Sequence, residues 1–170
     1  MACRRPKLAD SSAIAETHVF AWQHAYAGIM PSGYLNSLAV SSSEARWAQL
    51  LRSDEVHVLV VERTGIVCGF SRYGASRDSD AHSDTGEIYA INIHPNHWRE
   101  GLGSALLSAS LTDLEDIGFC RATLWVLESN DGARRFYEAR GWRYHGAQKL
   151  DAPPGCPELP HVRYDIEVAV

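Results

Sequence analysis

The feature that most constrains the fold is the stretch at residues 94–107, HPNHWREGLGSALL, in which two closely spaced glycines separate an apolar run from a leucine-rich segment. The run before it, EIYAINIHP, predicts a β-strand that Pro95 ends. The segment after it predicts a helix that ends at Gly118. A strand leading directly into a helix brings the unpaired N–H groups of the helix N-terminus to the corner. Gly101 and Gly103 keep side chains away from that corner, so it suits a phosphate or pyrophosphate.

The glycine pair has two other interpretations. A tight strand-to-helix turn without a ligand would show the same two glycines. A nucleotide-binding protein would need more, because the dinucleotide-binding fingerprint requires a third glycine near Leu106 and the P-loop requires Lys and Ser or Thr after the second glycine. Ser104 and Ala105 follow instead, so nucleotide binding ranks last among the functions that the corner allows.

The remaining pattern predicts an α+β domain with a mixed sheet. Two helices are expected at residues 11–27 and 41–53, followed by a β-hairpin at residues 55–63 and 66–74. A polar loop, ASRDSDAHSDTG, comes next, and we expect it to be mobile. The later elements are strands at residues 87–95, 121–128, 142–150 and 162–170, helices at residues 101–118 and 129–141, and a Pro-rich loop at residues 151–161. This order differs from a regular βαβ array, and 170 residues fit one domain spanning residues 1–170.

Composition and charge limit the partners. The net charge of -5 argues against a broad basic surface for nucleic acid and permits a cationic substrate. No apolar run approaches about 20 residues, and MACRRPKLAD lacks the apolar segment of a signal peptide, so we expect neither secretion nor a membrane span. The four cysteines show neither CxxC pairs nor metal-ligand spacing with His. We therefore expect no metal site and a location in the reducing cytoplasm.

Two motifs in this order resemble those of the GNAT superfamily, the acyl-CoA-dependent N-acetyltransferases. The first family pattern, Gln/Arg-x-x-Gly-x-Gly/Ala, corresponds to WREGLG at residues 98–103. The second, Asn-x-x-Ala-x-x-Phe-Tyr-x-x-x-Gly-Phe, corresponds to NDGARRFYEARGW at residues 130–142. Trp98 replaces the usual Gln or Arg, and Glu100 stands where relatives often carry a basic residue. Both changes weaken the attraction for a pyrophosphate, which leaves its binding to the backbone N–H groups and Arg99.

The resemblance implies a mixed, mostly antiparallel twisted sheet flanked by helices on both faces. It also implies transfer of an acetyl group from acetyl-CoA, the cosubstrate, to a primary amine of a small molecule or peptide, by direct attack in a ternary complex. A homodimer through the last strands is expected by analogy. In relatives the strand before the glycine corner offers its backbone to the pantetheine arm. The residues expected to bind the cofactor are Ile91, Asn92, Ile93, Arg99, Glu100, Gly101, Leu102, Gly103, Ser104, Asn130 and Tyr137.

Tyr137 is the expected catalytic acid, because a phenol with a pKa near ~10 is a reasonable match for an alkyl thiolate leaving group. Without that role it would be a half-buried side chain beside Phe136. Glu87 is the expected base, since many relatives use a carboxylate at this strand position, often through water. Its alternative is an exposed Glu beside a loop, and Glu128 is a weaker candidate for the base. Asn130 fits a helix N-cap as well as it fits a contact to the pantetheine arm.

Trp22, Tyr26 and Tyr34 are the expected substrate-binding residues, because relatives place substrate-facing helices there and an aromatic wall suits an organic cation or an apolar amine. Aromatic residues at helical spacing are also typical of a core. The main alternative function is a non-catalytic acyl-CoA-binding or regulatory module on the same fold, favoured by Trp98 and Glu100 in the first motif and opposed by the intact Asn130 and Tyr137 of the second, in which only Trp142 departs from the family pattern. An antibiotic, a polyamine and a protein amine remain open as acceptors.

Overall fold

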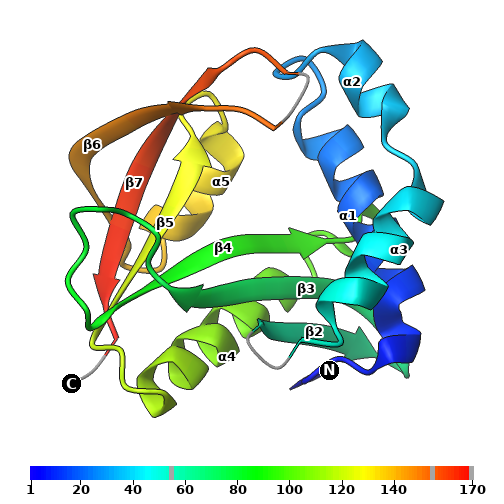
Figure 1. The fold of residues 1–170 in the computed structure, drawn as a ribbon, viewed down its shortest axis with the longest axis horizontal. Coiled ribbons are helices and arrows are strands. Elements are labelled where there is room, and N and C mark those ends of the chain that lie inside the picture. The colour runs from blue at the N-terminus through cyan, green and yellow to red at the C-terminus, as the bar shows by residue number, and fades with distance from the viewer. Residues whose placement is uncertain (54–55, 154–155, 169–170) are drawn as a thin grey trace.

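The computed structural model describes residues 1–53, 56–153 and 156–168. Within them, seven strands form one sheet in the order β1-β2-β3-β4-β5-β7-β6 (Figure 1). The strands are β1 Ala2–Arg4, β2 His57–Arg63, β3 Ile66–Ala75, β4 Thr85–Ile93, β5 Arg121–Leu127, β6 Arg143–Asp151 and β7 Leu159–Glu167. The helices are η1 Leu8–Asp10, α1 Ser11–Ala25, α2 Ser32–Ser37, α3 Val40–Leu50, η2 Pro95–His97, α4 Leu102–Asp116 and α5 Asp131–Glu138.

The expected α+β class, with a mostly antiparallel sheet and helices on both faces, is confirmed. All neighbouring strands are antiparallel except β4 and β5, which are parallel. The sequence did not predict β1 or α2, because elements of three and six residues are too short to show a period. The last strand begins at Leu159, inside the expected Pro-rich loop, and Pro160 is tolerated near its start. Residue 55 of the expected hairpin, residues 154–155 of that loop and residues 169–170 of the last expected strand lie outside the described residues.

One face of the sheet is covered by α4 and α5. Leu106 and Leu114 recur at helical spacing on α4 and are fully buried in a cluster with Ile88 of β4. Each such side chain contributes about 1.5–3 kcal/mol through burial. Gly86 on β4 lets α4 come close, because a Cβ at that position would lie 2.8 Å from Leu114 Cδ2. No helix of the described residues is long and apolar enough to cross a membrane.

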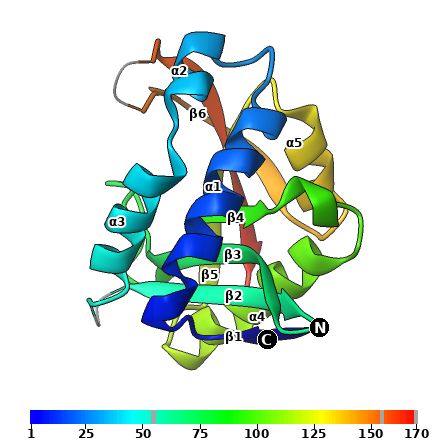
Figure 2. The same cartoon turned by 90° about the vertical axis from the view of Figure 1, so that its right-hand side faces the viewer.

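The opposite face is covered by α1 and α3, which lie side by side over β2 and β3 (Figure 2). Ile14 of α1 and Trp47 of α3 pack in one cluster with Phe70 of β3, and the Trp47 and Phe70 rings lie 4.7 Å apart. His18 of α1 lies among these rings and accepts a hydrogen bond from Trp47 Nε1 at 3.4 Å. Burial lowers the pKa of His18 to about 4, so this imidazole is neutral at pH 7.

β4 separates from β5 halfway along its length. Their parallel pairing covers only the first part of β4 and ends at Ile88. The next residue, Tyr89, is the extra residue of a β-bulge, because Tyr73 pairs with Ile88 and Arg72 pairs with Ala90. Beyond the bulge β4 and β5 diverge, as Figure 1 shows, and the second half of β4 faces the space between them.

Candidate active site

The second half of β4 offers backbone groups that no described strand pairs. His94 N–H donates to Cys68 O of β3 at 2.8 Å, and along an antiparallel pair every second residue is bonded in this way. Asn92 therefore also directs its backbone groups to β3. Ile91 and Ile93 direct theirs to the open edge, where they can pair with an extended ligand. Of the three strand residues expected to offer their backbone, the geometry thus leaves Ile91 and Ile93, and the Asn92 backbone is committed to the sheet.

The glycine corner follows this edge directly. Gly101 is the N-cap of α4 and has a φ of 81°, which glycine adopts without strain. Ala105 N–H makes the first hydrogen bond of the helix, to Gly101 O at 3.1 Å. The N–H groups of Leu102, Gly103 and Ser104 are consequently left without a helical partner. With the positive end of the helix dipole, they make the corner suitable for an anion.

The acidic residue in the corner is neutralised by a neighbour. Glu100 forms an ion pair with Arg63 at the end of β2, and His97 Nδ1 lies 3.4 Å from the same carboxylate. The hydrogen bond from Arg63 holds the pKa of Glu100 below its usual range. The carboxylate is thus ionised, but Arg63 offsets its charge. Arg99 turns the chain into the corner with a φ of 64°.

A second arginine, Arg140 just after α5, reaches the same corner. Its guanidinium donates to Ser104 Oγ at 2.5 and 3.1 Å and stacks on the Phe136 ring at 3.8 Å. Phe136 lies against Gly103, where a Cβ would meet the ring at 3.4 Å. Arg140 therefore adds a positive charge beside the free N–H groups of α4. The sequence gives no local signal for this contact, because Ser104 and Arg140 are 36 residues apart.

Trp98 forms a hydrogen bond with one of the backbone groups at the open edge of β4. Its indole N–H donates to Ile93 O at 2.7 Å, although the residue is 44% exposed. The Trp98 ring also meets His24 of α1 edge-on, with the centroids 6.3 Å apart. Trp98 therefore braces the corner against α1, and Ile93 N–H is the group that remains free at the end of β4.

Tyr137 lies on α5 and carries an unused hydroxyl. Its ring packs against Phe136 at 5.1 Å and Trp142 at 5.9 Å, and the hydroxyl makes no hydrogen bond with a described residue. Burial, with a smaller contribution from Tyr26 of α1, raises the pKa of Tyr137 well above its usual value. The phenol therefore keeps its proton at neutral pH. Asn130 caps α5, since its Oδ1 accepts from Ala133 N–H at 3.1 Å, which confirms the N-cap interpretation.

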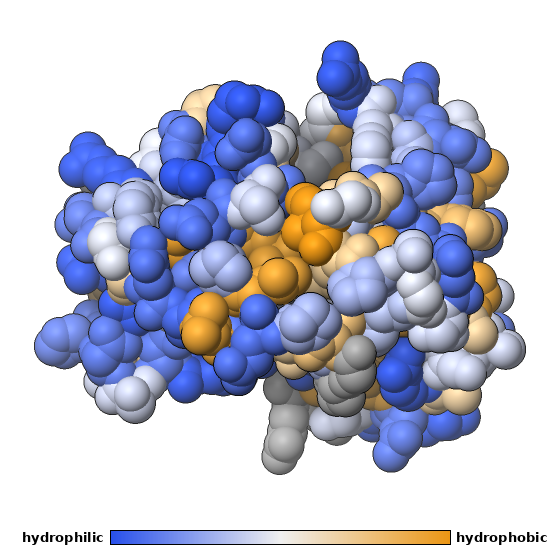
Figure 3. Space-filling view, turned by 90° about the horizontal axis from the view of Figure 1, so that it is seen from above, coloured by the Kyte–Doolittle hydropathy of each residue, from blue (hydrophilic) through white to orange (hydrophobic). Residues whose placement is uncertain are grey.

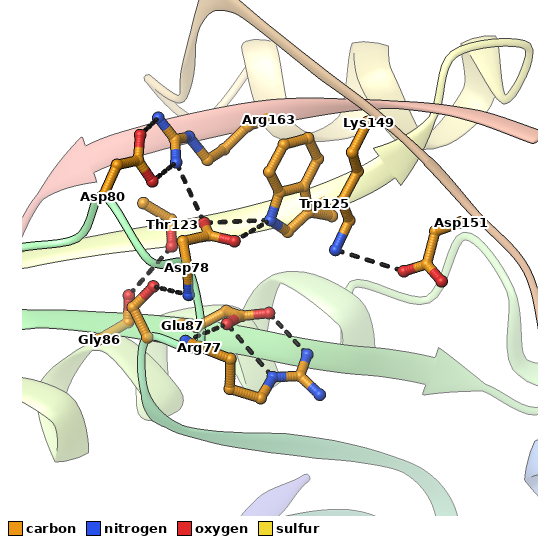
Figure 4. A network of polar contacts seen from close by, with 11 residues as sticks. Arg77, Asp78, Asp80, Gly86, Glu87, Thr123, Trp125, Lys149, Asp151 and Arg163 are labelled. Carbon is orange, nitrogen blue, oxygen red and sulfur yellow. Dashed lines mark hydrogen bonds and ion pairs between the residues drawn. The ribbon is translucent and has the colours of Figure 1, made fainter.

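Glu87 is not an exposed residue beside a loop but the most buried charged side chain of the described chain, with 2% exposure. Arg77 holds its carboxylate, donating from the backbone N–H at 2.9 Å and from Nη2 at 2.7 Å (Figure 4). The Arg77 guanidinium also stacks on the Tyr89 ring at 4.1 Å. Glu87 thus lies next to the bulge of β4 with a fixed orientation.

The polar loop between β3 and β4, which we expected to be mobile, is tied to the sheet by a second set of contacts shown in Figure 4. Asp78 accepts from Trp125 Nε1 at 2.9 Å and from Arg163 at 3.2 Å, while Asp80 accepts from Arg163 at 2.7 Å. Trp125 lies on β5 and Arg163 on β7, so the loop bridges the strands on the far side of the split. Segments this far apart in sequence give no signal of such an anchor.

The three expected substrate-binding residues come together near the end of α1. Trp22 and Tyr26 lie edge to face with their centroids 5.1 Å apart, and Tyr34 of α2 joins them against buried Met30 and Leu127. They are therefore partly core residues, as the alternative interpretation held. Figure 3 shows hydrophobic side chains gathered in a hollow of the upper face, between the two halves of the molecule. Among the described residues, no group of three His, Cys, Asp or Glu side chains is placed to hold a metal ion.

Comparison with known proteins gives consistent matches. The sequence profile of the Acetyltransferase (GNAT) family matches residues 20–142. An uncharacterized N-acetyltransferase of Bacillus subtilis, YuaI, is 36% identical over 136 residues, covering 80% of this chain and 76% of that protein. The L-amino acid N-acyltransferase MnaT of Escherichia coli is 27% identical over 143 residues, covering 84% and 79%.

Solved structures share the fold. YncA of Salmonella typhimurium, solved with its cofactor acetyl-CoA, superposes with a TM-score of 0.73 at 24% identity, covering 98% of this chain and 93% of that one. A ribosomal-protein-alanine N-acetyltransferase of Brucella melitensis superposes with a TM-score of 0.76 at 18% identity, covering 98% and 99%.

Proposed function

The chain belongs to the acetyltransferase (GNAT) family and is an N-acetyltransferase; on that premise we propose that it transfers the acetyl group of acetyl-CoA to a primary amine of a small molecule or peptide, by direct attack in a ternary complex. The observation that carries this proposal is the unpaired edge of β4 that leads straight into the glycine corner of α4. One extended ligand with a pyrophosphate at one end matches both features.

The proposed cofactor site uses backbone groups more than side chains. The free N–H groups of Leu102, Gly103 and Ser104 bind the pyrophosphate, with Arg99 and Arg140 supplying positive charge. Trp98 and Glu100, the two departures from the family pattern, are accommodated by the contacts to Ile93 O and Arg63 rather than by the ligand. Glu100 therefore shapes the corner without contacting the ligand, and the Asn92 backbone, which is paired with β3, holds the strand in place.

The backbone of β4 holds the rest of the proposed cofactor. Ile93 N–H and Ile91 C=O pair with the amides of the pantetheine arm, and the side-chain NH2 of Asn130, whose oxygen caps α5, donates to the same arm. Ile91 N–H lies two residues beyond the bulge and donates to the thioester carbonyl oxygen as charge develops on it.

The proposed chemistry moves two protons. Glu87 removes a proton from the attacking amine through a water molecule, and Arg77 fixes the orientation of the carboxylate. The new C–N bond forms as the C–S bond breaks, and Tyr137 donates its phenolic proton to the departing sulfur. The raised pKa of Tyr137 ensures that this proton is present throughout the neutral range.

A non-catalytic acyl-CoA-binding module is the second candidate. Trp98 already donates a hydrogen bond to Ile93 O, which removes one backbone acceptor from the proposed cofactor site. The two functions differ in turnover. We would incubate the protein with acetyl-CoA and a library of amines, including amino acids, polyamines, aminoglycosides and peptides, and follow acetylated products by mass spectrometry. Transfer to any member supports the enzyme. Binding of acetyl-CoA without transfer to any of them supports the module.

We also propose that the chain acts as a single cytoplasmic domain that forms a homodimer. Support for the dimer is that β6 lies at the edge of the sheet and carries Leu150, which is 64% exposed. The four cysteines are free, which suits a reducing compartment. Light scattering on the wild type and on Leu150→Lys tests the dimer: a monomeric wild type, or a dimer indifferent to the substitution, contradicts it.

A further inference from the structure

Arg72 of β3 lies on the face of the sheet that is opposite α4. The preceding residue, Ser71, points to the α4 face, where its Oγ accepts a hydrogen bond from the Ser110 hydroxyl at 2.8 Å. Side chains alternate along a strand, so Arg72 points to the same side as Phe70, which packs under α1 and α3. Beyond the cover of these helices, Arg72 reaches the Tyr89 ring, with its guanidinium carbon 5.4 Å from the centroid.

Arg72 differs from its neighbour Arg77 in having no acidic partner among the described residues. Both guanidinium groups lie against Tyr89, but Arg77 forms an ion pair with Glu87. Arg72 forms no ion pair with a described side chain, and its Nε is buried without any hydrogen-bond partner in that part of the chain. A buried donor without a partner costs about 1–3 kcal/mol, so an arginine in this state needs a functional explanation.

Arg72 lines a surface pocket with space of about 470 Å³, which suits a small molecule. The pocket lies at the end of the sheet, where Tyr89 and His57 line it together with Tyr73 and, just beyond α4, Ile117 and Phe119. Tyr89 connects the pocket with the proposed reaction centre, because it is the bulge residue of β4 and its ring contacts both Arg72 and Arg77, the partner of Glu87. Arg72 is the direct cross-strand partner of Ala90, and Ala90 precedes Ile91, whose N–H we assign to the thioester carbonyl.

We propose that Arg72 binds a carboxylate of the acceptor, so that the amine acetylated by this enzyme belongs to an amino acid or to another small aminocarboxylic acid. This inference rests on the proposed function and specifies its substrate class. The planar guanidinium offers two parallel N–H donors, which match the two oxygens of a carboxylate. A single unpaired arginine supplies one positive charge, which balances a carboxylate and only part of the charge of a phosphate. The acceptor then lies with its amine toward β4 and its carboxylate on Arg72.

The test compares acceptors that differ only in this group. The twenty L-amino acids and their α-carboxamides are assayed in pairs with acetyl-CoA, with O-phosphoethanolamine as a phosphate-bearing probe. We expect the acids to exceed their amides in kcat/KM by about 10- to 100-fold, the range that a charge-assisted hydrogen bond gives. In Arg72→Met that preference disappears through a higher KM, and Arg72→Lys retains part of it. Arg143→Met, which removes an exposed arginine from β6, leaves it unchanged.

Stability separates this role from a structural one. Because the buried Nε has no partner among the described residues, Arg72→Met is expected to unfold at the same temperature as the wild type or above it. Amides acetylated as well as acids, a preference that survives in Arg72→Met, or a stronger reaction with O-phosphoethanolamine would overturn the proposal while leaving the enzyme intact. Absence of transfer to every acid and every amide would instead overturn the proposed function, and the acceptor assignment with it.

Discussion

Replacing Tyr137 by Phe isolates the proposed proton transfer from packing. The substitution removes one oxygen and keeps the ring that packs against Phe136 and Trp142. The hydroxyl has no hydrogen-bond partner among the described residues, so its loss leaves no partner unpaired. We therefore expect the free energy of unfolding to change by no more than about 0.5 kcal/mol. Acetyl-CoA affinity should fall at most about tenfold, the effect of one neutral hydrogen bond.

The effect on turnover should be much larger. General acid catalysis contributes about 10²–10⁴-fold, so kcat of Tyr137→Phe should fall by that factor, equivalent to about 2.7–5.4 kcal/mol in the barrier. Since the pKa of Tyr137 is raised by burial, this tyrosine should add no alkaline limb to the wild-type kcat profile below about pH 10.

The assay should separate acetyl-CoA from CoA by chromatography, because Cys120 is exposed and would react with a thiol reagent. Tyr144→Phe is the matched control, since it removes a hydroxyl from an exposed tyrosine of β6. The reasoning is refuted if Tyr137→Phe turns over as fast as the wild type, or if its loss of rate merely follows a loss of folded protein.

Three further substitutions test other parts of the account. Glu87→Gln should lower kcat per folded molecule by about 10²–10⁴-fold, and a kcat equal to that of the wild type would exclude Glu87 as the base. Gly101→Ala should lower the melting temperature by about 2–8 °C, because a side chain at φ 81° costs about 1–2 kcal/mol even though no described atom lies within 4 Å of the new Cβ; an unchanged melting temperature would contradict this. The wild type should lose up to about 3 kcal/mol of stability as the pH falls from 6.5 to 4, because the unfolded chain protonates His18 before the folded one does. Urea unfolding of His18→Gln should lack that part of the slope, and an identical slope would exclude His18.

Local features of the sequence predicted the fold well. The glycine pair, the leucine spacing of α4 and the Asn cap of α5 each act over a few residues, and each is found where it was expected. The split between β4 and β5 was not predictable, because it depends on a bulge at Tyr89 that appears only when the partner strand is known.

The charged contacts of the site were hidden for a similar reason. Glu100 meets Arg63 from 37 residues away, and Arg140 reaches the start of α4 from just beyond α5. Glu87 was the expected base, with an exposed side chain beside the loop as the alternative, and neither interpretation included Arg77, which folds back to hold the carboxylate. Pairs of this kind are set by which elements pack together, and an isolated sequence carries no periodic signal for them.

The central claim is that the free edge of β4 and the glycine corner of α4 form one acetyl-CoA site. Calorimetric titration of acetyl-CoA into the wild type and Gly103→Phe tests it most directly, with Ser108→Phe on an exposed turn of the same helix as the control. The account predicts binding in the micromolar range with one cofactor per chain, lost in Gly103→Phe and kept in Ser108→Phe. No binding to the folded wild type at millimolar acetyl-CoA would contradict it.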